Sequence, residues 1–294
     1  MHTLRRRGYT LVEVMIALVL LSVVSAAIYR VLITNQQTYI AQTQRIDLQE
    51  NLRAAVTVLP AEFRELDATD GDIISMGPSS ITIRAMRQLG VICNPPVLGG
   101  GLGGVGLTIR QTPFYALRQF NLANDQLLIY YEGDESTRSD DSWVLAPMTG
   151  VVSQNCPDGR PGWRITVNPS FVAGQLNVAG AIPDGAPVKG FEVVQYSLYQ
   201  APPPDSRWYL GQTKSGSTQP LIGPLSGSSA FRLNYFDAAG AQTAVRTQVA
   251  SIEIKVEAQT QSRVRDPTRL GVSYKTDSVV TRVALRNNVR FIGN

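Results

Sequence analysis

The sequence is poor in histidine and cysteine, and this scarcity excludes several kinds of chemistry. The only histidine is His2, so the rest of the chain lacks the usual base for a serine or cysteine nucleophile and the commonest metal ligand. The two cysteines, Cys93 and Cys156, are too far apart for a Cys-x-x-Cys metal or redox motif. We therefore expect no catalytic residues, no metal site and no cofactor, which makes an enzyme the weakest class of function.

The same two cysteines leave two interpretations open. In a domain exported to an oxidising compartment, Cys93 and Cys156 can form a disulfide. Two separate buried thiols that behave as small hydrophobic side chains account for them nearly as well.

The chain also lacks a strong excess of charge of one sign. It carries 27 basic and 23 acidic residues, and three of the basic ones are Arg5, Arg6 and Arg7 in the first eight positions. The remaining charges are nearly balanced and scattered. Binding to nucleic acid depends on a concentrated basic face that neutralises phosphates, so we expect no direct nucleic-acid partner.

Glycine and proline are absent from Tyr9 to Leu59, and this predicts one continuous helix. From Val14 to Ile28 its residues are apolar apart from two serines. A helix over Tyr9 to Ile28 matches a hydrocarbon core of about 30 Å at about 1.5 Å per residue. The arginines before it should stay in the cytoplasm, which places the rest of the chain outside.

Glu13 is the one charge within this apolar segment. A carboxylate in a spanning helix costs about 2.5 to 3.5 kcal/mol and therefore indicates a partner. Cleavage after Gly8 would give Tyr9 a free amine, one helical turn from Glu13. In staggered parallel helices, the amine of one chain and the carboxylate of the next could pair.

The run from Gly8 to Glu13, Gly-Tyr-Thr-Leu-Val-Glu, with its basic leader and apolar helix, resembles the class III signal of type IV prepilins and type II secretion pseudopilins. The resemblance implies cleavage after Gly8 by a membrane prepilin peptidase, N-methylation of Tyr9, and a role for Glu13 in subunit docking. It also implies major and minor pilins or pseudopilins and an inner-membrane assembly platform as partners. The usual first residue in the family is Phe, from which Tyr9 departs mildly.

Three other interpretations compete for this segment. A secretory signal peptide would be cleaved near Ser25-Ala26-Ala27, but Glu13 is hard to explain within its apolar region. A twin-arginine export signal is weaker still, since nothing later in the chain suggests a cofactor inserted before export. A plain membrane anchor explains the length and leaves Gly8 and Glu13 without a role.

The second half of the helix carries an apolar stripe at spacings of three and four. Its members are Leu48, Leu52, Ala55 or Val56, Leu59, Phe63 and Leu66. Pro60 predicts a kink or a restart, and Asp70-Gly71 ends the element. We expect the stripe to pack against the domain that follows.

The rest of the chain predicts antiparallel strands separated by long loops. The expected strands are 81–84, 107–110, 126–131, 163–167, 191–198, 230–236, 249–256 and 279–285. Pro202 to Pro204 and Ser215 to Ser229 are expected as exposed loops. The fold class is thus α+β: a long N-terminal helix packed on an antiparallel sheet. The expected parts are a leader (1–8), a transmembrane half-helix (9–29), an amphipathic half-helix (30–66) and a head (67–294).

Two motifs suggest ligands, but loops account for both of them better. Glycines between Gly99 and Gly106 satisfy Gly-x-Gly-x-x-Gly, yet no strand precedes and no helix follows, so we expect a flexible loop. An acidic segment could gather oxygen ligands for calcium but lacks the EF-hand spacing, so we expect a solvated loop there. Its carboxylates are Glu132, Asp134, Glu135, Asp140 and Asp141.

The size of the head and the ending Thr281 to Asn287 resemble PilW-like minor pilins and the J-type pseudopilin. This implies a low-copy subunit that primes assembly at the tip of a type IV pilus or type II secretion pseudopilus. The subunit would start in the inner membrane with its head outside the cytoplasm. The alternative is a membrane-tethered binding or adhesion module, for which Glu13 has no use.

Overall fold

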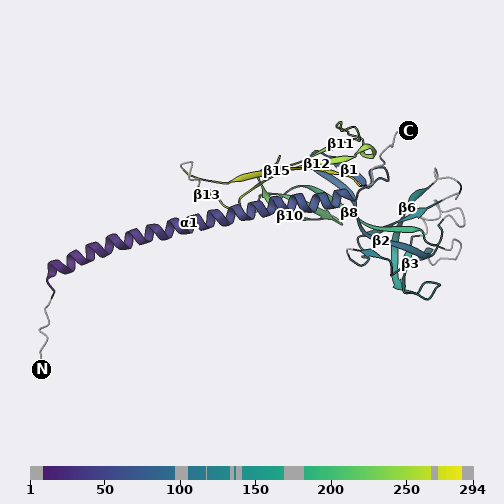
Figure 1. The fold of residues 1–294 in the computed structure, drawn as a ribbon, viewed down its shortest axis with the longest axis horizontal. Coiled ribbons are helices and arrows are strands. Elements are labelled where there is room, and N and C mark those ends of the chain that lie inside the picture. Colours follow the sequence, from purple (N-terminus) through teal and green to yellow (C-terminus); the bar gives the residue numbers. More distant parts are fainter. Residues whose placement is uncertain are drawn as a thin grey trace, which may run out of the picture.

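The computed structural model describes residues 9–96, 105–116, 118–132, 136, 141–168, 182–265 and 271–286. A single long helix, α1, projects from a head built of antiparallel strands (Figure 1). The α+β class expected from the sequence is therefore confirmed.

Helix α1 (Leu11–Arg64) has 54 residues. Thr10 is its N-cap, and the N–H of Glu13 donates to the Thr10 side chain over 3.3 Å. Of the kink or restart predicted at Pro60, the restart does not occur, because α1 continues through that residue to Arg64 and the proline is buried. Pro60 has no backbone N–H to donate, and it lies in the last turns of the helix. The buried residues on either side of it, Leu59 and Phe63, hold these turns in place.

All eight predicted strands are present, and several others join them. The strands are β1 (Ile73–Gly77), β2 (Ser80–Asn94), β3 (Val105–Arg110), β4 (Tyr115–Ala116), β5 (Asp125–Tyr131), β6 (Ser142–Ser153), β7 (Gly162–Val167), β8 (Pro187–Gln200), β9 (Trp208–Lys214), β10 (Ser217–Leu225), β11 (Phe231–Phe236), β12 (Ser251–Gln259), β13 (Val264–Arg265), β14 (Val272–Ser273) and β15 (Thr276–Ala284). A short 3-10 helix, η2 (Arg246–Gln248), precedes β12.

Two expected loops contain strands. Most of the segment expected as an exposed loop from Ser215 is β10, whose Ile222 and Leu225 are buried. Its register shifts between Pro220 and Ile222 and again between Ile222 and Leu225, so its prolines sit beside bulges, where a strand tolerates a missing donor. Gly106, expected in the glycine loop, lies in β3, while residues 97–104 are outside the described ranges. The exposed Pro202 to Pro204 loop is as predicted.

The head contains two hydrophobic cores, which define a proximal and a distal lobe. In the proximal lobe the predicted helix stripe packs against the inner faces of β1, β2, β8, β9, β10, β11, β12 and β15. Its helix residues are Leu48, Leu52, Ala55, Leu59, Phe63 and, just past the helix end, Leu66. Leu59 and Phe63 are fully buried. The inner face of β12 carries Ile252, Ile254 and Val256, all of them buried.

The distal lobe is a closed ring of strands. Its order is β2-β3-β7-β6-β5-β8, and β8 pairs back onto β2. A separate core fills the ring with residues such as Ile92, Leu107, Ile129, Ile165 and Val188. Closure leaves these strands without open edges along the ring, which is how small barrels avoid edge-to-edge association.

Strands β2 and β8 belong to both lobes. They pair from Ser80↔Ser197 to Val91↔Pro187, and the register shifts between Met86 and Gln88. Arg87 is thus an extra residue in β2, and buried positions change there from odd to even numbers. The chain leaves the proximal lobe along β2 and returns along β8, so the distal lobe is an insertion between two paired strands. Figure 1 places it beyond the C-terminal end of α1.

Candidate functional site

The candidate processing and docking residues lie at the start of α1. Gly8, with the rest of the leader, is outside the described residues. Tyr9 is 82% exposed, and Glu13 stands in the first helical turn, where its N–H is capped by Thr10. The order Thr10-Leu11-Val12-Glu13 also has the spacing of a capping box. Glu13 thus lies at the positive end of the helix dipole, where a carboxylate interacts favourably with the free backbone N–H groups of the first turn.

Among the described residues, the first half of α1 is exposed and buries no side chain against the head. Its large apolar side chains, from Leu11 to Leu32, are between about half and four fifths exposed. By length and composition α1 can cross a membrane, and none of its most apolar window is buried. Between Leu11 and Tyr29 the single charged residue is Glu13. Such a surface needs an apolar environment, either lipid or the corresponding helices of other subunits.

A network of buried charges joins α1 to β2 and β8 at Arg87 and Glu192, where the two lobes meet. We call this part of the head the waist. Arg87, on the β2 bulge, donates to Glu62 of α1 over 3.0 Å and to Glu192 of β8 over 3.3 Å. The side chain of Arg87 is 8% exposed and that of Glu192 5%. Glu192 also lies 3.4 Å from Lys214 and 3.7 Å from Arg118. The network therefore couples the end of α1 to the strands that carry the distal lobe.

The waist network continues into the distal lobe through a fully buried carboxylate. Asp125 forms a two-bonded pair with Arg118, and it accepts from the Asn121 N–H over 2.7 Å and from Gln88 over 3.2 Å. The hydrogen bonds and charge of Asp125 raise the pKa of Arg118, while Glu62 and Glu192 raise that of Arg87 against the effect of burial. Both guanidinium groups stay charged.

This network was not predicted from the sequence, although the burial pattern of β2 and β8 contains a signal for it. Arg87 continues the odd-numbered buried series Ile81, Ile83 and Ala85 in β2. Glu192 occupies a buried position in phase with Val188 and Val194 in β8. A charged residue on the apolar face of an alternating strand points to a buried partner of opposite charge.

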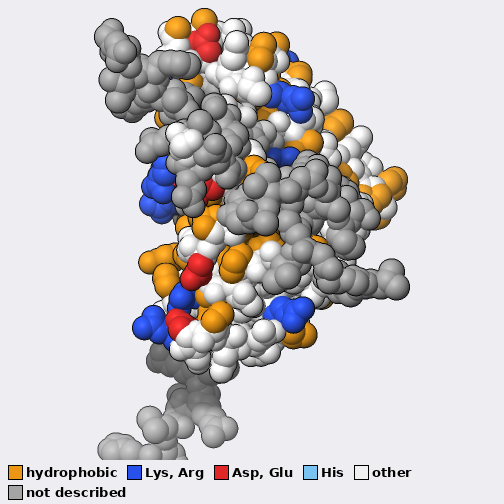
Figure 2. Space-filling view, turned by 90° about the vertical axis from the view of Figure 1, so that its right-hand side faces the viewer, with side chains coloured by type: hydrophobic (Ala, Val, Ile, Leu, Met, Phe, Trp, Pro, Cys, Tyr) orange, Lys and Arg blue, Asp and Glu red, His pale blue; other side chains and the backbone are white. Residues whose placement is uncertain are grey.

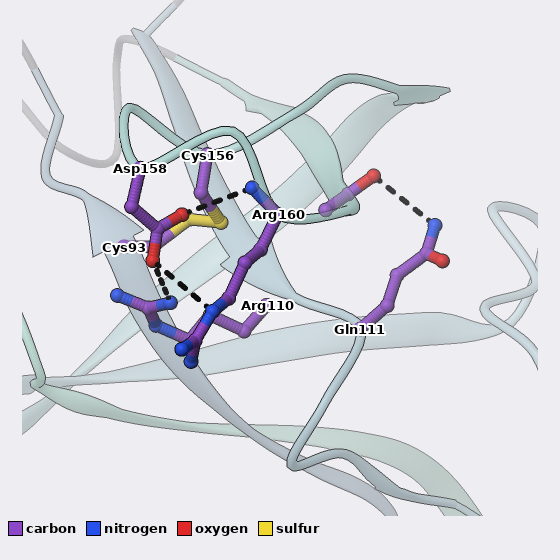
Figure 3. The surroundings of a disulfide bond; sticks show 7 residues. Cys93, Arg110, Gln111, Cys156, Asp158 and Arg160 are labelled. Atoms are coloured by element: carbon purple, nitrogen blue, oxygen red, sulfur yellow. Dashed lines mark hydrogen bonds and ion pairs between the residues drawn. A yellow bond between two sulfur atoms is a disulfide. The ribbon is translucent and has the colours of Figure 1, made fainter.

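The structure joins Cys93 and Cys156 in a disulfide in the distal lobe (Figure 3). Cys93 is in β2 and Cys156 is in the turn after β6, and both are buried. Beside them Asp158 accepts hydrogen bonds from the Arg110 side chain and, over 3.1 Å, from the Arg160 N–H. The bond from Arg110 lowers the pKa of Asp158. The bridge thus ties the turn before β7 to the end of β2.

One carboxyl group in the proximal lobe has a raised pKa. Burial raises the pKa of Asp72 to about 6, although its Oδ2 accepts a hydrogen bond from the Asp67 N–H over 2.9 Å. Asp72 lies in the connection from α1 to β1 and is 9% exposed. We assign the raised pKa of Asp72 an effect on stability.

The acidic segment that was expected as a solvated loop lies only partly within the described residues. Within the described ranges, no group of three or more His, Cys, Asp or Glu side chains comes together as a metal site. Of the acidic segment, Asp134, Glu135 and Asp140 lie outside those ranges, and Asp141 accepts a hydrogen bond from Tyr130 over 2.8 Å. On the distal end of the head, basic and acidic side chains stand scattered among apolar ones (Figure 2). This surface has no pronounced basic face among the side chains in view.

The beginning of the chain matches a known protein family. The model of a family described as the prokaryotic N-terminal methylation motif matches residues 3–29. No curated protein and no solved structure matches the chain. The matched residues include Gly8, Tyr9, Glu13 and the exposed apolar half of α1. They support a type IV pilin-like or pseudopilin-like protein whose apolar helix fits a single membrane anchor.

Proposed function

We propose that the chain is a structural minor pilin or pseudopilin subunit that assembles into a type IV pilus or type II secretion pseudopilus. The observation that carries this proposal is the exposed apolar half of α1 with one carboxylate, Glu13, in its first turn. The match to the N-terminal methylation motif over residues 3–29 supports it. The subunit does no chemistry of its own in this account.

Processing prepares the helix for assembly. A prepilin peptidase cuts after Gly8, and the new N-terminal amine of Tyr9 is methylated. Tyr9 and Glu13 are four residues apart, about 6 Å along a helix axis. In a staggered bundle of parallel helices, the amine of one subunit can therefore approach Glu13 of its neighbour. Pairing offsets the cost of two charges in an apolar surrounding.

The parts of the chain take separate roles in this proposal. The leader (1–8) stays in the cytoplasm until it is removed, the first half-helix (9–29) spans the inner membrane, and the second half-helix (30–66) holds the head. The head (67–294) lies outside the cytoplasm. An inner-membrane platform then moves the subunit from lipid into the fibre, where other pilins or pseudopilins surround α1.

The position of the distal lobe favours the fibre tip. It lies beyond the C-terminal end of α1 (Figure 1). In a fibre of stacked parallel helices, the space beyond that end belongs to the head of the next subunit. A terminal subunit has no such neighbour. We infer a low-copy subunit that initiates assembly.

The test is the substitution Glu13→Gln, with Glu50→Gln as the matched control. Glu50 is an exposed residue of the same helix outside the membrane segment. Glu13→Gln keeps the side-chain shape and removes the charge, so the helix inserts at a lower desolvation cost but loses its attraction to a neighbouring amine. We expect it to insert, keep a protease-resistant head, and fail to enter fibres or crosslink to partner pilins. Glu50→Gln should assemble as the parent does.

Processing must be measured on the same samples. Intact-mass and N-terminal analysis should give a methylated Tyr9 start for the parent and for both variants. A chain that starts at Ile28 would instead identify a secretory signal peptide and overturn the pilin proposal. Processed Glu13→Gln protein that assembles at parental levels would overturn the charge-pairing mechanism.

A membrane-tethered binding module is the second candidate, and the distal lobe favours it. This closed ring has its own core and reaches away from the membrane helix. A tether would hold such a lobe in place without any fibre. The Glu13→Gln experiment separates the two functions, because a tether has no need of that charge.

A further inference from the structure

A short two-stranded extension of the proximal lobe lies beside the middle of α1, on the side that leads to the membrane segment. We call its described residues, 260–265 and 271–276, the basic arm; they include β13 and β14, which pair as Val264↔Ser273 and Arg265↔Val272. Figure 1 shows β13 displaced from the rest of the head toward the N-terminal half of the helix. The arm is thus the described part of the head that lies nearest to the apolar half of α1.

The arm is held against α1 by one buried side chain and two polar contacts. Val264 is 3% exposed. The Ser262 N–H donates to Gln44 over 3.0 Å, and the Arg265 guanidinium lies 3.5 Å from the Gln37 side-chain oxygen. These contacts fix the height of the arm along the helix, with Arg265 and its partner Val272 at its lower end.

The outward side of the arm combines exposed cations with exposed apolar and aromatic groups. Arg263, Arg265, Val272 and Tyr274 are all exposed, and Arg263 lies over the Tyr274 ring at 5.6 Å. The described residues of the arm include no carboxylate. Arginine with tyrosine and a small apolar side chain is the composition that suits a membrane–water interface.

The arm also stands at the height of the interface. The apolar segment of α1 ends at Tyr29 and Arg30, residue types that anchor helices at headgroup level. Gln37 is about 12 Å further along the helix axis. The headgroup layer accounts for about 5 to 8 Å of that distance. The remaining gap is shorter than the Debye length of about 8 Å at physiological ionic strength.

We propose that the basic arm binds the phosphates of anionic phospholipids on the outer surface of the membrane that holds α1. The inference rests on the proposed function only in that α1 spans a membrane. The contact sets the depth and the tilt of the subunit in the membrane before the subunit is extracted. This contact between the arm and the lipid breaks when α1 moves into a fibre. A stronger contact therefore makes extraction from the membrane harder.

The experiment uses the full chain in vesicles with a tryptophan probe, Val272→Trp, at the lower end of the arm. Vesicles contain phosphatidylcholine alone or mixed with phosphatidylglycerol, with a nitroxide quencher on the headgroup. The parent chain, with Trp143, Trp163 and Trp208, provides the background. We expect strong quenching of the probe only in anionic vesicles. High salt should remove it.

The charge dependence is tested with Arg263→Gln and Arg265→Gln together in the probe background. Each arginine near an anionic surface changes membrane partition by roughly fivefold, so the double variant should lose the added quenching. The matched control is Arg232→Gln with Lys255→Gln, an exposed cross-strand pair elsewhere on the sheet. It removes the same charge and should leave quenching unchanged.

Two further readouts separate the possible failures. A second probe, Val19→Trp, should be quenched by an acyl-chain nitroxide; without that quenching α1 does not insert, and the proposed function fails with the inference. If Val19→Trp is quenched and Val272→Trp is not, or is quenched equally in neutral vesicles, only the arm inference is overturned. Shielding of Val272→Trp from a soluble quencher that rises with protein concentration would overturn it in favour of a second copy of this chain.

Discussion

Replacing Arg87 tests whether the buried charges at the waist hold the head together. Arg87→Met keeps most of the side-chain volume and removes the guanidinium that donates to both Glu62 and Glu192. Glu62 is 21% exposed and can turn toward water, whereas Glu192 is 5% exposed and stays buried. The cost of the substitution should therefore come mainly from Glu192.

The surroundings of Glu192 set the magnitude. Breaking a buried ion pair by removing one partner typically costs about 3 to 5 kcal/mol. Lys214 at 3.4 Å and Arg118 at 3.7 Å remain beside Glu192, so we expect the low end, about 3 kcal/mol, for Arg87→Met. Glu62→Gln leaves Arg87 paired with Glu192 and should cost about 1 kcal/mol. The double variant Arg87→Met/Glu192→Leu should be less destabilised than Arg87→Met, because it removes the stranded carboxylate.

The assay is urea unfolding of the full chain in detergent micelles. Trp143 and Trp163 report on the distal lobe and Trp208 on the proximal lobe. The free energy of unfolding comes from the midpoint and slope of the fluorescence transition. If Arg87→Met unfolds within about 0.5 kcal/mol of the parent, or if the double variant is less stable than the single one, the network does not stabilise the waist as argued.

Two more substitutions test the titrating and covalent features. Because the pKa of Asp72 is raised to about 6 in the fold, its ionisation opposes folding, and its contribution to stability falls as pH rises from about 4 to about 6. Asp72→Asn should therefore exceed the parent in unfolding free energy at pH 7 by up to about 3 kcal/mol and match it below about pH 4; an equal difference at both pH values would contradict this. The Cys93–Cys156 bridge spans 63 residues, and its removal in Cys93→Ser/Cys156→Ser should cost up to about 4 kcal/mol in the chain-entropy model. Alkylation of both thiols in unreduced, denatured parent protein would show that the bridge does not form.

The sequence carried enough information for the helix and for its buried stripe. Both follow from local patterns: no helix breaker before Pro60, and apolar residues such as Leu52 and Leu59 at helical spacing. The strand β12 was predicted from its alternation of apolar and polar residues. Strand β10 was not predicted because its prolines and glycine are typical of a loop. They are compatible with a strand because the pairing with β9 has bulges beside them.

The division of the head into two lobes depends on pairings between distant residues. Ring closure requires Ile92 to pair with Ile109 and Ile129 to pair with Val188, and no local pattern specifies those registers. The candidate site divides in the same way. Glu13 stands out because it is the one charge in an apolar segment, whereas Arg87 and Glu192 gain their meaning only when β2 and β8 meet.

Because the distal lobe is inserted between the paired strands β2 and β8, it can be replaced without disturbing the proximal lobe. Gln88 and Gly190 are cross-strand partners, so the chain departs and returns at points only about 5 Å apart. Insertions at such close-spaced points are tolerated because the host fold keeps all of its own contacts. Residues 92–186 could thus be exchanged for another domain, or for a short turn, while α1 and the proximal core stay as they are. Diversity at the exposed end can then accumulate without any change in α1.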